Sequence, residues 1–563
     1  MKVNGVEIWV ADSETDPFDY DIIPKPFIWG VYNGKDYWEF SETKDFLDFV
    51  REKEIILYAH NGGKFDWHFL SEWFEPDEPI LVIAGRLAKF KIGKCEFRDS
   101  VNIYAKPLEA FQKEKFDYDK MYESVRHLYM DEIRSYLKSD CENLFNLVTG
   151  FIDTYGLHIT TASAAMKFWQ YRTPGGRNSV PRSTGVFYET FSRFYYGGRV
   201  QCFEQGDITV NAKSADINSA YPTAMMHEHP YGLIYIGEEN EPRKNVDKWG
   251  PMFFDIECIS RGAFCYRGTN GTLYYPDDGV KRFYHVTGWE LQAAIETETV
   301  VDLKILNHYE FAELKSFAPY IDYFWNIRKE YKAAGDVHAS DFAKLLMNSL
   351  YGKFAANPER YRENFLVPKE KFYSEFVESQ LHENDNWHEF REWVIVQREQ
   401  DNSKKMYYNL ATAASITGFV RAKLWRAICD SDRPFYCDTD SITAVDFGKS
   451  IKIGNELGEW GIENEYDRVI MCGKKLYAFH KRGQSLKNPK SWKTASKGVR
   501  LNHDDIIRVA AGKTVNYRSL APTFSVAKSD PTFISRDIKL TAGDSRVVPR
   551  RYDPMFQDVN TEM

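Results

Sequence analysis

The sequence has no apolar run of ~18 residues, which excludes a helix that spans a membrane. Its eight cysteines are scattered with no C-x-x-C pair, which argues against zinc ribbons, iron–sulfur clusters and a disulfide framework. The amino-terminal segment turns polar before a secretory signal could form, so we expect a cytoplasmic protein with reduced thiols. Internal repeats and low-complexity tracts are also absent.

The composition is that of a large globular protein. The chain has 563 residues, 43% of them hydrophobic and 28% charged, which indicates about three to four domains and excludes a disordered protein. A net charge of −9 argues against a polyanion partner, but residues 473–550 contain 17 Lys and Arg against 5 Asp and Glu. This basic segment fits a nucleic-acid surface, and a solvated basic domain remains the alternative.

The order of patterns along the chain predicts several domains. Residues 1–157 alternate short apolar strands with helical stretches, which is typical of an α/β domain. A loop with a PGG turn at 171–185 marks a boundary. Residues 357–407 are polar, charge-dense and rich in aromatics, so we expect an inserted subdomain here and not a core element.

A first set of carboxylates begins near the amino terminus. Val6, Ile8, Val10, Asp12 and Glu14 share one parity, so a strand would point both acids to the side of its apolar face, just past its end. Two carboxylates so placed repel one another unless a cation lies between them. A D-x-E pattern by itself is more often an acidic loop.

Three further residues make that alternative harder to hold. Asp66 follows NGG, an ordinary hairpin signal, and Asp140 lies one helical turn after Tyr136. Phosphodiester hydrolysis uses two divalent ions about 3.5–4 Å apart, and carboxylate oxygens suit Mg²⁺. In such a site Tyr136 would orient the attacking water.

A second set of carboxylates lies in the middle of the chain. We expect Asp216 in a turn after a strand that contains Ile208 and Val210. Asp438 and Asp440 flank Thr439 on one face of a strand or hairpin. Either pattern alone is more often a structural turn.

A helix between these acids carries a polar face. Lys344, Asn348 and Tyr351 are spaced i, i+4 and i+7, so they share one side of a helix. A structural helix usually buries an apolar stripe there, whereas a cation, an amide and an aromatic ring suit a ligand with phosphates and a flat base. We therefore expect this face to bind a nucleoside triphosphate.

The first acid set resembles the three Exo motifs of DEDDy 3′–5′ proofreading exonucleases, through Asp12-x-Glu14, Asn61-x-x-x-Phe65-Asp66 and Tyr136-x-x-x-Asp140. The resemblance implies that Asp12, Glu14, Asp66 and Asp140 hold metal ions. It also implies that single-stranded ends are held by Thr15, Asn61, Phe65 and Ser100, with Phe65 stacking on a base. Lys115 matches the family's catalytic lysine over a short segment.

The second set resembles motifs A, B and C of family B DNA polymerases, through Asp216-x-x-Ser219-x-Tyr221, Lys344-x-x-x-Asn348-Ser349-x-Tyr351 and Asp438-Thr439-Asp440. The resemblance implies that Asp216 and Asp440 hold two catalytic metals with Asp438 nearby. Nucleotide binding would fall to Lys344, Arg328, Asn348, Tyr221 and Tyr351. Tyr221 would crowd a ribose 2′-hydroxyl, and Tyr351 would pack on the nascent base pair.

Two shorter motifs suggest contacts to DNA. Lys475 and Tyr477 match the K-x-Y motif and would share one strand face towards primer phosphates. The Y-x-G-G motif is matched by Tyr196, Gly197, Gly198 and Arg199, whose glycines would let backbone approach DNA. We add Lys497 in the basic segment as a DNA contact.

The fold implied is α/β and α+β multidomain: a ribonuclease H-like exonuclease domain, then a right-hand polymerase with two insertions. The spacing of the motifs is similar to the protein-primed subgroup, and several stretches look like tectivirus polymerases. The expected domains are exonuclease 1–157, palm 158–230 and 408–498, terminal-protein-region insertions 231–317 and 357–407, fingers 318–356 and thumb 499–563.

The resemblance implies a replicative polymerase that starts from a terminal protein, displaces strands and proofreads. Its partners would be primer-template DNA, single-stranded DNA, dNTPs and the terminal protein, as a monomer or a heterodimer with that protein, and no membrane. Mg²⁺ would serve both sites, two ions in each, and Mn²⁺ could replace it. The alternatives are a family B polymerase primed by nucleic acid, and a non-catalytic protein that binds replication forks. A nuclease alone leaves Lys344, Asn348 and Tyr351 unexplained.

Overall fold

The structure is a computed structural model of the 563-residue chain. It describes residues 1–540 except 77, 109–114, 174–178, 241, 243, 270, 358–360 and 400–406. The PGG of the predicted boundary loop, part of the second insertion and the end of the predicted thumb lie outside the described residues. Among the helices that are described, none combines the length and apolarity of a membrane span.

The amino-terminal region is built on a mixed sheet of 11 strands in the order β20-β21-β19-β6-β7-β8-β5-β2-β3-β4, with β1 paired to β2. Its central strands β2, β5 and β8 are parallel, and the long helix α2 (Met130–Tyr155) packs against β2 and β3. The strands are β1 (Lys2–Val3), β2 (Val6–Thr15), β3 (Pro26–Tyr32), β4 (Tyr37–Phe40), β5 (Ile55–Ala59), β6 (Pro79–Ile83), β7 (Arg86–Ile92), β8 (Cys95–Asp99), β19 (Arg362–Pro368), β20 (Asn386–Phe390) and β21 (Trp393–Glu399).

The second predicted insertion is more closely tied to the core than its polar composition suggested. Strand β19 pairs with β6 through Asn364 with Ile80 and Phe365 with Pro79. Leu366 and Ile395 are buried in the same cluster as the amino-terminal strands, and their neighbours Val367, Val394 and Val396 form a second buried cluster. The expectation that this segment is not a core element was wrong, because β19 and β21 bury apolar side chains on both faces.

A second sheet has the order β26-β25-β24-β10-β23-β22-β9. Its central strand is β10 (Gly206–Ile217), flanked by β23 (Ser441–Asp446) and β24 (Trp460–Gly473). The outer strands are β9 (Val200–Cys202), β22 (Asp432–Asp438), β25 (Leu476–Lys481) and β26 (Trp492–Ser496). Helix α12 (Leu410–Asp430) is buried along most of its length and contacts β23.

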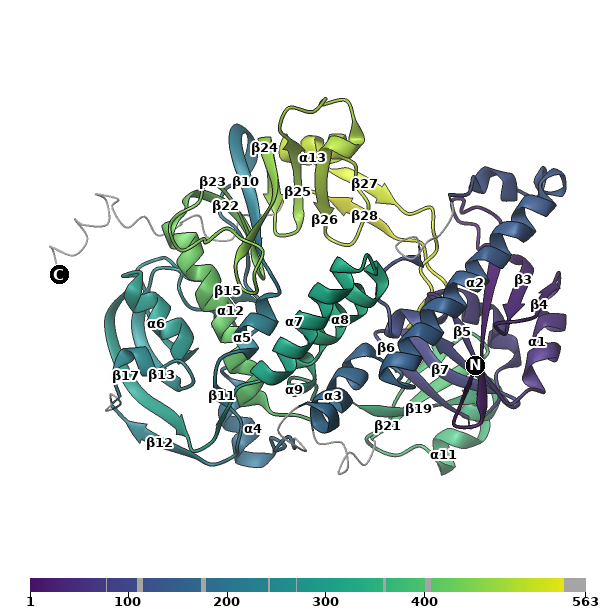
Figure 1. Cartoon of the computed structure of the whole chain (residues 1–563), viewed down its shortest axis with the longest axis horizontal. Helices are drawn as coiled ribbons and strands as arrows, with labels where there is room; N and C mark the ends of the chain where they lie inside the picture. Colours follow the sequence, from purple (N-terminus) through teal and green to yellow (C-terminus); the bar gives the residue numbers. More distant parts are fainter. Residues whose placement is uncertain are drawn as a thin grey trace.

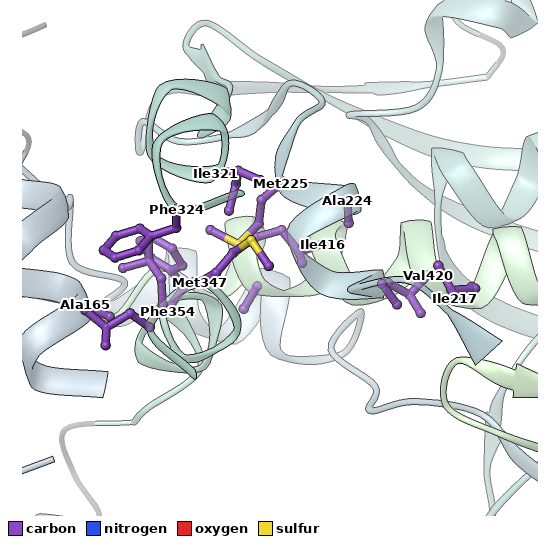
Figure 2. Packing of buried hydrophobic residues seen from close by; sticks show 14 of the residues in the cluster. Ala165, Ile217, Ala224, Met225, Ile321, Phe324, Met347, Phe354, Ile416 and Val420 are labelled. Atoms are coloured by element: carbon purple, nitrogen blue, oxygen red, sulfur yellow. The ribbon is translucent and has the colours of Figure 1, made fainter. Parts of the chain in front are cut away.

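Helices α7 (Ala318–Ala333) and α8 (Val337–Ser349) form an antiparallel pair in the centre of the molecule, between the amino-terminal region and the second sheet (Figure 1). They meet α3 (Thr161–Arg172), α5 (Ala220–Met225), α9 (Tyr351–Phe354) and α12 in one hydrophobic cluster. Figure 2 shows Met225 of α5, Phe324 of α7 and Met347 of α8 within it. Through this packing, α7 and α8 are held against α5 and α12.

The first predicted insertion has a separate four-stranded sheet, ordered β12-β17-β13-β16. Its strands are β12 (Tyr235–Glu239), β13 (Phe253–Ser260), β16 (Lys281–Thr287) and β17 (Val300–Phe311). Helix α6 (Gly288–Glu296) connects β16 to β17. The short pair β11 (His229–Pro230) and β18 (Leu314–Lys315) brings its two ends together. The two ends of the insertion are therefore adjacent in space.

The basic segment at the carboxyl end reaches back to the amino-terminal region. Helix α13 (His503–Ala510) is followed by strands β27 (Val515–Arg518) and β28 (Ser535–Ile538), which pair with each other. The loop that joins these two strands lies against the amino-terminal region. Phe524 contacts Phe65 at 5.5 Å between ring centroids, and Val526 N donates to Gly85 O at 3.1 Å. The first and last described parts of the chain are therefore in contact.

Two candidate active sites

The first site gathers three of the four predicted exonuclease acids. Ligand oxygens of Asp12, Glu14 and Asp140 all lie within 4.8 Å of one another. Asp12 and Glu14 lie inside β2, which runs to Thr15, so the prediction that they fall past the strand's end was wrong. Asp140 comes from α2, whose face towards the sheet also buries Tyr136. Three carboxylates at this spacing are suited to a divalent cation.

Asp66 lies beside this group and is held differently. Ser13 Oγ donates to Asp66 Oδ1 at 2.5 Å, and burial raises the pKa of Asp66 to about 6. The preceding NGG is not a hairpin, because Gly62–Lys64 form a 3-10 turn with Asn61 in the left-handed region at φ 66°. Asp66 opens the 3-10 helix η2 (Asp66–Trp73) that follows.

Sequence reasoning missed the residues that hold this turn. Asp99, buried at the end of β8, accepts hydrogen bonds from Asn61 N at 3.1 Å and Gly63 N at 3.0 Å. Arg86 Nη1 pairs with Asp99 Oδ2 at 2.6 Å and donates to Asn61 Oδ1 at 2.8 Å. The sequence marks Asp99 only as an acid at the end of CEFRD, a segment in which apolar and polar residues alternate.

The other predicted exonuclease residues are distributed around the three acids. Tyr136 stacks on Phe116 with ring centroids 4.6 Å apart, and its hydroxyl lies 3.0 Å from that of Tyr118. Thr15 is half-buried and Lys115 exposed. Ser100 is fully buried, with Oγ 2.9 Å from His60 Nδ1. Its role in holding single-stranded ends stays a prediction, and the buried hydroxyl lies against His60.

The second site joins Asp216 near the end of β10 to Asp440 in the turn between β22 and β23. Burial, and then the charges of Asp440 and Glu463, raise the pKa of Asp216 to about 7. Burial raises the pKa of Asp440 to about 6, and the charges of Asp438 and Glu463 act in the same direction. Crowded carboxylates of this kind are relieved by a bound cation. Asp216 lies within β10, so its prediction as a turn residue was wrong.

Asp438 is held by other side chains. Its carboxylate accepts from Tyr436 OH at 3.1 Å and Thr439 Oγ1 at 3.2 Å, and pairs with Lys475 Nζ at 3.1 Å. Glu463 on β24, which sequence reasoning missed, pairs with Lys493 Nζ at 2.8 Å. Glu463 stands at an irregular register between β10 and β24, and no sequence signal marks that irregularity.

The predicted nucleotide residues converge beside Asp216. Lys344 and Asn348 lie on α8, and Tyr351 opens α9 after Leu350, whose helical φ −66° and ψ −47° continue the same face. The rings of Tyr221 and Tyr351 stack with centroids 4.0 Å apart and planes 11° apart. Arg328 comes from α7, and burial lowers its pKa.

The Y-x-G-G segment touches the turn that carries Asp438 and Asp440. Thr439 N donates to Arg199 O at 2.7 Å, and a Cβ on Gly198 would lie 2.7 Å from the Thr439 side chain. Arg199 itself is 1% exposed and donates to Gly262 O at 2.9 Å between the rings of Tyr275 and Trp425. Because this guanidinium is buried, the DNA contact that the Y-x-G-G motif implies would fall to the backbone of the segment.

A second buried arginine fixes the same segment. Arg421 on α12 donates to Tyr196 O at 2.6 Å and Gly197 O at 3.0 Å. It also pairs with Glu290 of α6 through bonds of 2.7 and 2.9 Å. Tyr196 is buried beside it and Gly197 is exposed. Neither Arg421 nor Glu290 stands in a recognisable motif.

The K-x-Y residues do not share a strand face. Lys475 lies in the turn before β25 with φ 54°, and only Tyr477 is in the strand. The prediction was wrong because β24 and β25 are joined by a tight turn that takes Lys475 out of the pleat. Tyr477 packs on Tyr436 at 5.1 Å, and Lys497 N donates to Lys475 O at 2.8 Å. The exposed Lys497 thus lies beside Lys475.

Two acidic centres, with a helix-borne cation, amide and aromatic ring beside one of them, are the arrangement expected of a nucleic-acid polymerase with a second acidic site. A sequence profile of the family described as DNA polymerase type B, organellar and viral, matches residues 99–444. The chain belongs to this family, and it is a DNA-directed DNA polymerase.

Similar proteins include polymerases of several phages. The DNA-directed DNA polymerase of Enterobacteria phage PRD1 is 35% identical and the match covers 95% of this chain and 98% of that one. The DNA polymerase of Bacillus phage Nf is 23% identical over 78% of this chain and 80% of its own.

The fold is shared with a solved structure of Phi29 DNA polymerase complexed with primer-template DNA and incoming nucleotide. That match has a TM-score of 0.70 and 18% identity, and covers 95% of this chain and 100% of the other. The predicted fold, an exonuclease domain followed by a right-hand polymerase, is confirmed.

Proposed function

We propose that the chain copies DNA at the site around Asp216 and Asp440. The observation that carries this proposal is the juxtaposition of two partly buried acids: burial, and then the charges of neighbouring carboxylates, raise the pKa of Asp216 to about 7 and that of Asp440 to about 6. Oxygen ligands in a partly buried site suit Mg²⁺, with Mn²⁺ as a substitute. Two bound ions would supply activation of the primer 3′-hydroxyl and stabilisation of the leaving oxygen.

The surrounding side chains would place the nucleotide. Lys344 and Arg328 would neutralise the triphosphate, which favours a guanidinium and an ammonium over neutral groups. The stacked pair of Tyr221 and Tyr351 forms a flat wall, which would pack against the sugar and the nascent base pair. Asn348 is half-buried on the same helix and would bind the nucleotide between them.

We propose that the second acid group proofreads by removing 3′-terminal nucleotides. Asp12, Glu14 and Asp140 would hold the metal ions, and Asp66 would join them after rotating away from Ser13. Tyr136 and Lys115 would serve the attacking water. Phe65 lies in an aromatic group with Phe69, Phe18 and Phe524, a surface on which single-stranded bases can stack, and Thr15 and Asn61 would hold the same strand end.

Primer extension with matched variants tests both assignments. Asp216→Ala should abolish nucleotide addition and leave 3′-end degradation intact, while Asp140→Ala should do the reverse. Loss of both activities in either variant, with the fold retained, would contradict two separate sites. Extension past one full turn of a primed single-stranded circle would show the proposed strand displacement.

We also propose that synthesis starts on a hydroxyl of a terminal protein, which would bind the two insertions. The motif spacing supports this, and so do the separate sheet of residues 231–317 and the position of β19–β21 beside β6. Other partners would be primer-template DNA, held by Tyr477, Lys475, Lys497 and Gly197, in the cytoplasm of a host cell. Transfer of a labelled dNMP to a candidate priming protein tests the proposal. Efficient extension of oligonucleotide primers with no transfer to protein would favour priming by nucleic acid.

A further inference from the structure

A loop of the amino-terminal region contacts α8, the helix that carries Lys344. Lys106, a few residues after β8, pairs through Nζ with Asp341 Oδ2 on α8 at 2.5 Å. Tyr104 OH donates to the same oxygen at 3.3 Å, and its ring packs on Phe342 with centroids 5.5 Å apart. His60 Nε2 lies 2.9 Å from Lys106 O, which fixes the backbone of the loop.

Asp341 stands among three cations. It lies three residues before Lys344, so the two side chains are neighbours on the helix surface. Burial lowers the pKa of Lys344, and the charges of Arg328 and Lys106 lower it further, while Asp216 and then Asp341 act in the opposite direction. Asp341 also acts on Arg328. One carboxylate is thus within electrostatic reach of both proposed triphosphate ligands.

Arg328 retains unused hydrogen-bonding capacity. Its Nε is buried and has no hydrogen-bond partner among the described residues. A buried donor without a partner is unfavourable, and a ligand that accepts a hydrogen bond from it relieves that cost. If Asp341 were not held by Lys106, it would be free to pair with Arg328 or Lys344, and it would compete with a phosphate for them.

We propose that Lys106 is a positioning residue of the polymerase site, which holds Asp341 so that Arg328 and Lys344 remain available to the incoming triphosphate. The inference rests on the proposed roles of Arg328 and Lys344. It assigns part of nucleotide binding to a residue of the exonuclease domain.

Steady-state extension of a primed template, with dNTP concentration varied, tests the proposal. Lys106→Ala should raise KM for dNTP about tenfold, which is ~1.4 kcal/mol, and leave kcat within about twofold of wild type. Adding Asp341→Asn should return KM to within about twofold of wild type, because the amide carries no charge to compete. Asp341→Asn alone should not raise KM.

A different pattern of KM values is expected if the Lys106–Asp341 ion pair only stabilises the fold. Asp341→Asn would then raise KM as much as Lys106→Ala does, and the double variant would not recover; either result overturns the proposal. Lys44→Ala removes an exposed lysine paired with Asp48 at 2.5 Å in the same domain, and should change nothing. Degradation of single-stranded DNA should be normal in every variant, which confirms folding.

Lys344→Ala, measured in parallel, separates this inference from the proposed function. An unchanged KM in Lys344→Ala would refute the nucleotide site itself. A raised KM in Lys344→Ala with an unchanged KM in Lys106→Ala would refute only the role of Lys106.

Discussion

Gly198 is the residue at which the Y-x-G-G segment presses on the catalytic turn. An added Cβ would lie 2.7 Å from Thr439 Oγ1 and Cγ2, so the turn with Asp438 and Asp440 must shift. Because a 1 Å misplacement can cost about 100-fold, we expect Gly198→Ala to slow primer extension by ~10- to 100-fold and to spare 3′-end degradation.

Gly150→Ala is the control, since a Cβ there meets no heavy atom within 4 Å and the residue lies on α2, away from the polymerase acids. Both variants should be compared for primer extension and 3′-end degradation in the same preparations. Equal activity in the two variants would show that the contact with Thr439 is not needed.

At this scale the sequence predicted which side chains lie together better than it predicted how they are held. Asp12, Glu14 and Asp140, whose oxygens lie within 4.8 Å of one another, could be found because they stand in motifs with fixed spacing. Asp99 and Glu463 could not, since their partners Asn61 and Asp216 are remote in sequence and are met only after folding. Arg199 matched a motif, yet its side chain is buried by rings from elsewhere in the chain.

Among the elements, α12 and α6 are joined by the buried pair of Arg421 and Glu290, whose side chains are 2% and 5% exposed. Removing one partner of a buried pair leaves an uncompensated charge and costs about 3–5 kcal/mol. Glu290→Ala should lower the free energy of unfolding by that amount, as measured by urea denaturation.

Glu296→Ala on the same helix provides the comparison. Its partner is Arg426, and the side chains are 55% and 32% exposed, so the loss should stay below ~1 kcal/mol. Similar losses from the two variants would contradict the importance of burial here.

Helices and strands with a clear hydrophobic periodicity could be predicted from the sequence. The pairing of strands that are far apart in the sequence could not. The apolar alternation from Val6 and the helical pattern around Asp140 indicated β2 and α2, although β2 continues through both acids to Thr15. The pairing of β19 with β6 left no sequence signal, because a strand's own pattern does not name its neighbour. Lys475 was misplaced because tight turns between strands override the period of two.

At the scale of the whole molecule, His68 lies where three remote parts of the chain meet. It is 1% exposed, its ring lies 5.6 Å from that of Phe390 and 5.3 Å from that of Phe524, and burial lowers its pKa to about 3. The folded state therefore binds fewer protons than the unfolded state between pH 3 and the ordinary pKa of 6.5. The stability from neutral His68 is complete above pH 6.5 and is lost as pH falls below it.

His68→Gln should flatten this dependence. Between pH 6.5 and 5.5 the wild type should lose about 1 kcal/mol more unfolding free energy than the variant, since one pKa unit corresponds to ~1.4 kcal/mol. Urea unfolding at several pH values measures the difference. His382→Gln, at an exposed position, should keep the wild-type slope; the same slope in His68→Gln would contradict the prediction.

The strand pair β6–β19 also bears on how the chain is made. The partners are separated by about 280 residues, and translation adds ~5–20 residues per second, so β6 waits roughly 15–60 s on the ribosome for its neighbour. Until then the amino-terminal sheet ends in an open strand edge, which is prone to pair with other chains. A fragment cut after the exonuclease domain would retain that edge permanently, so it should need the hairpin β19–β21 supplied with it to remain monomeric.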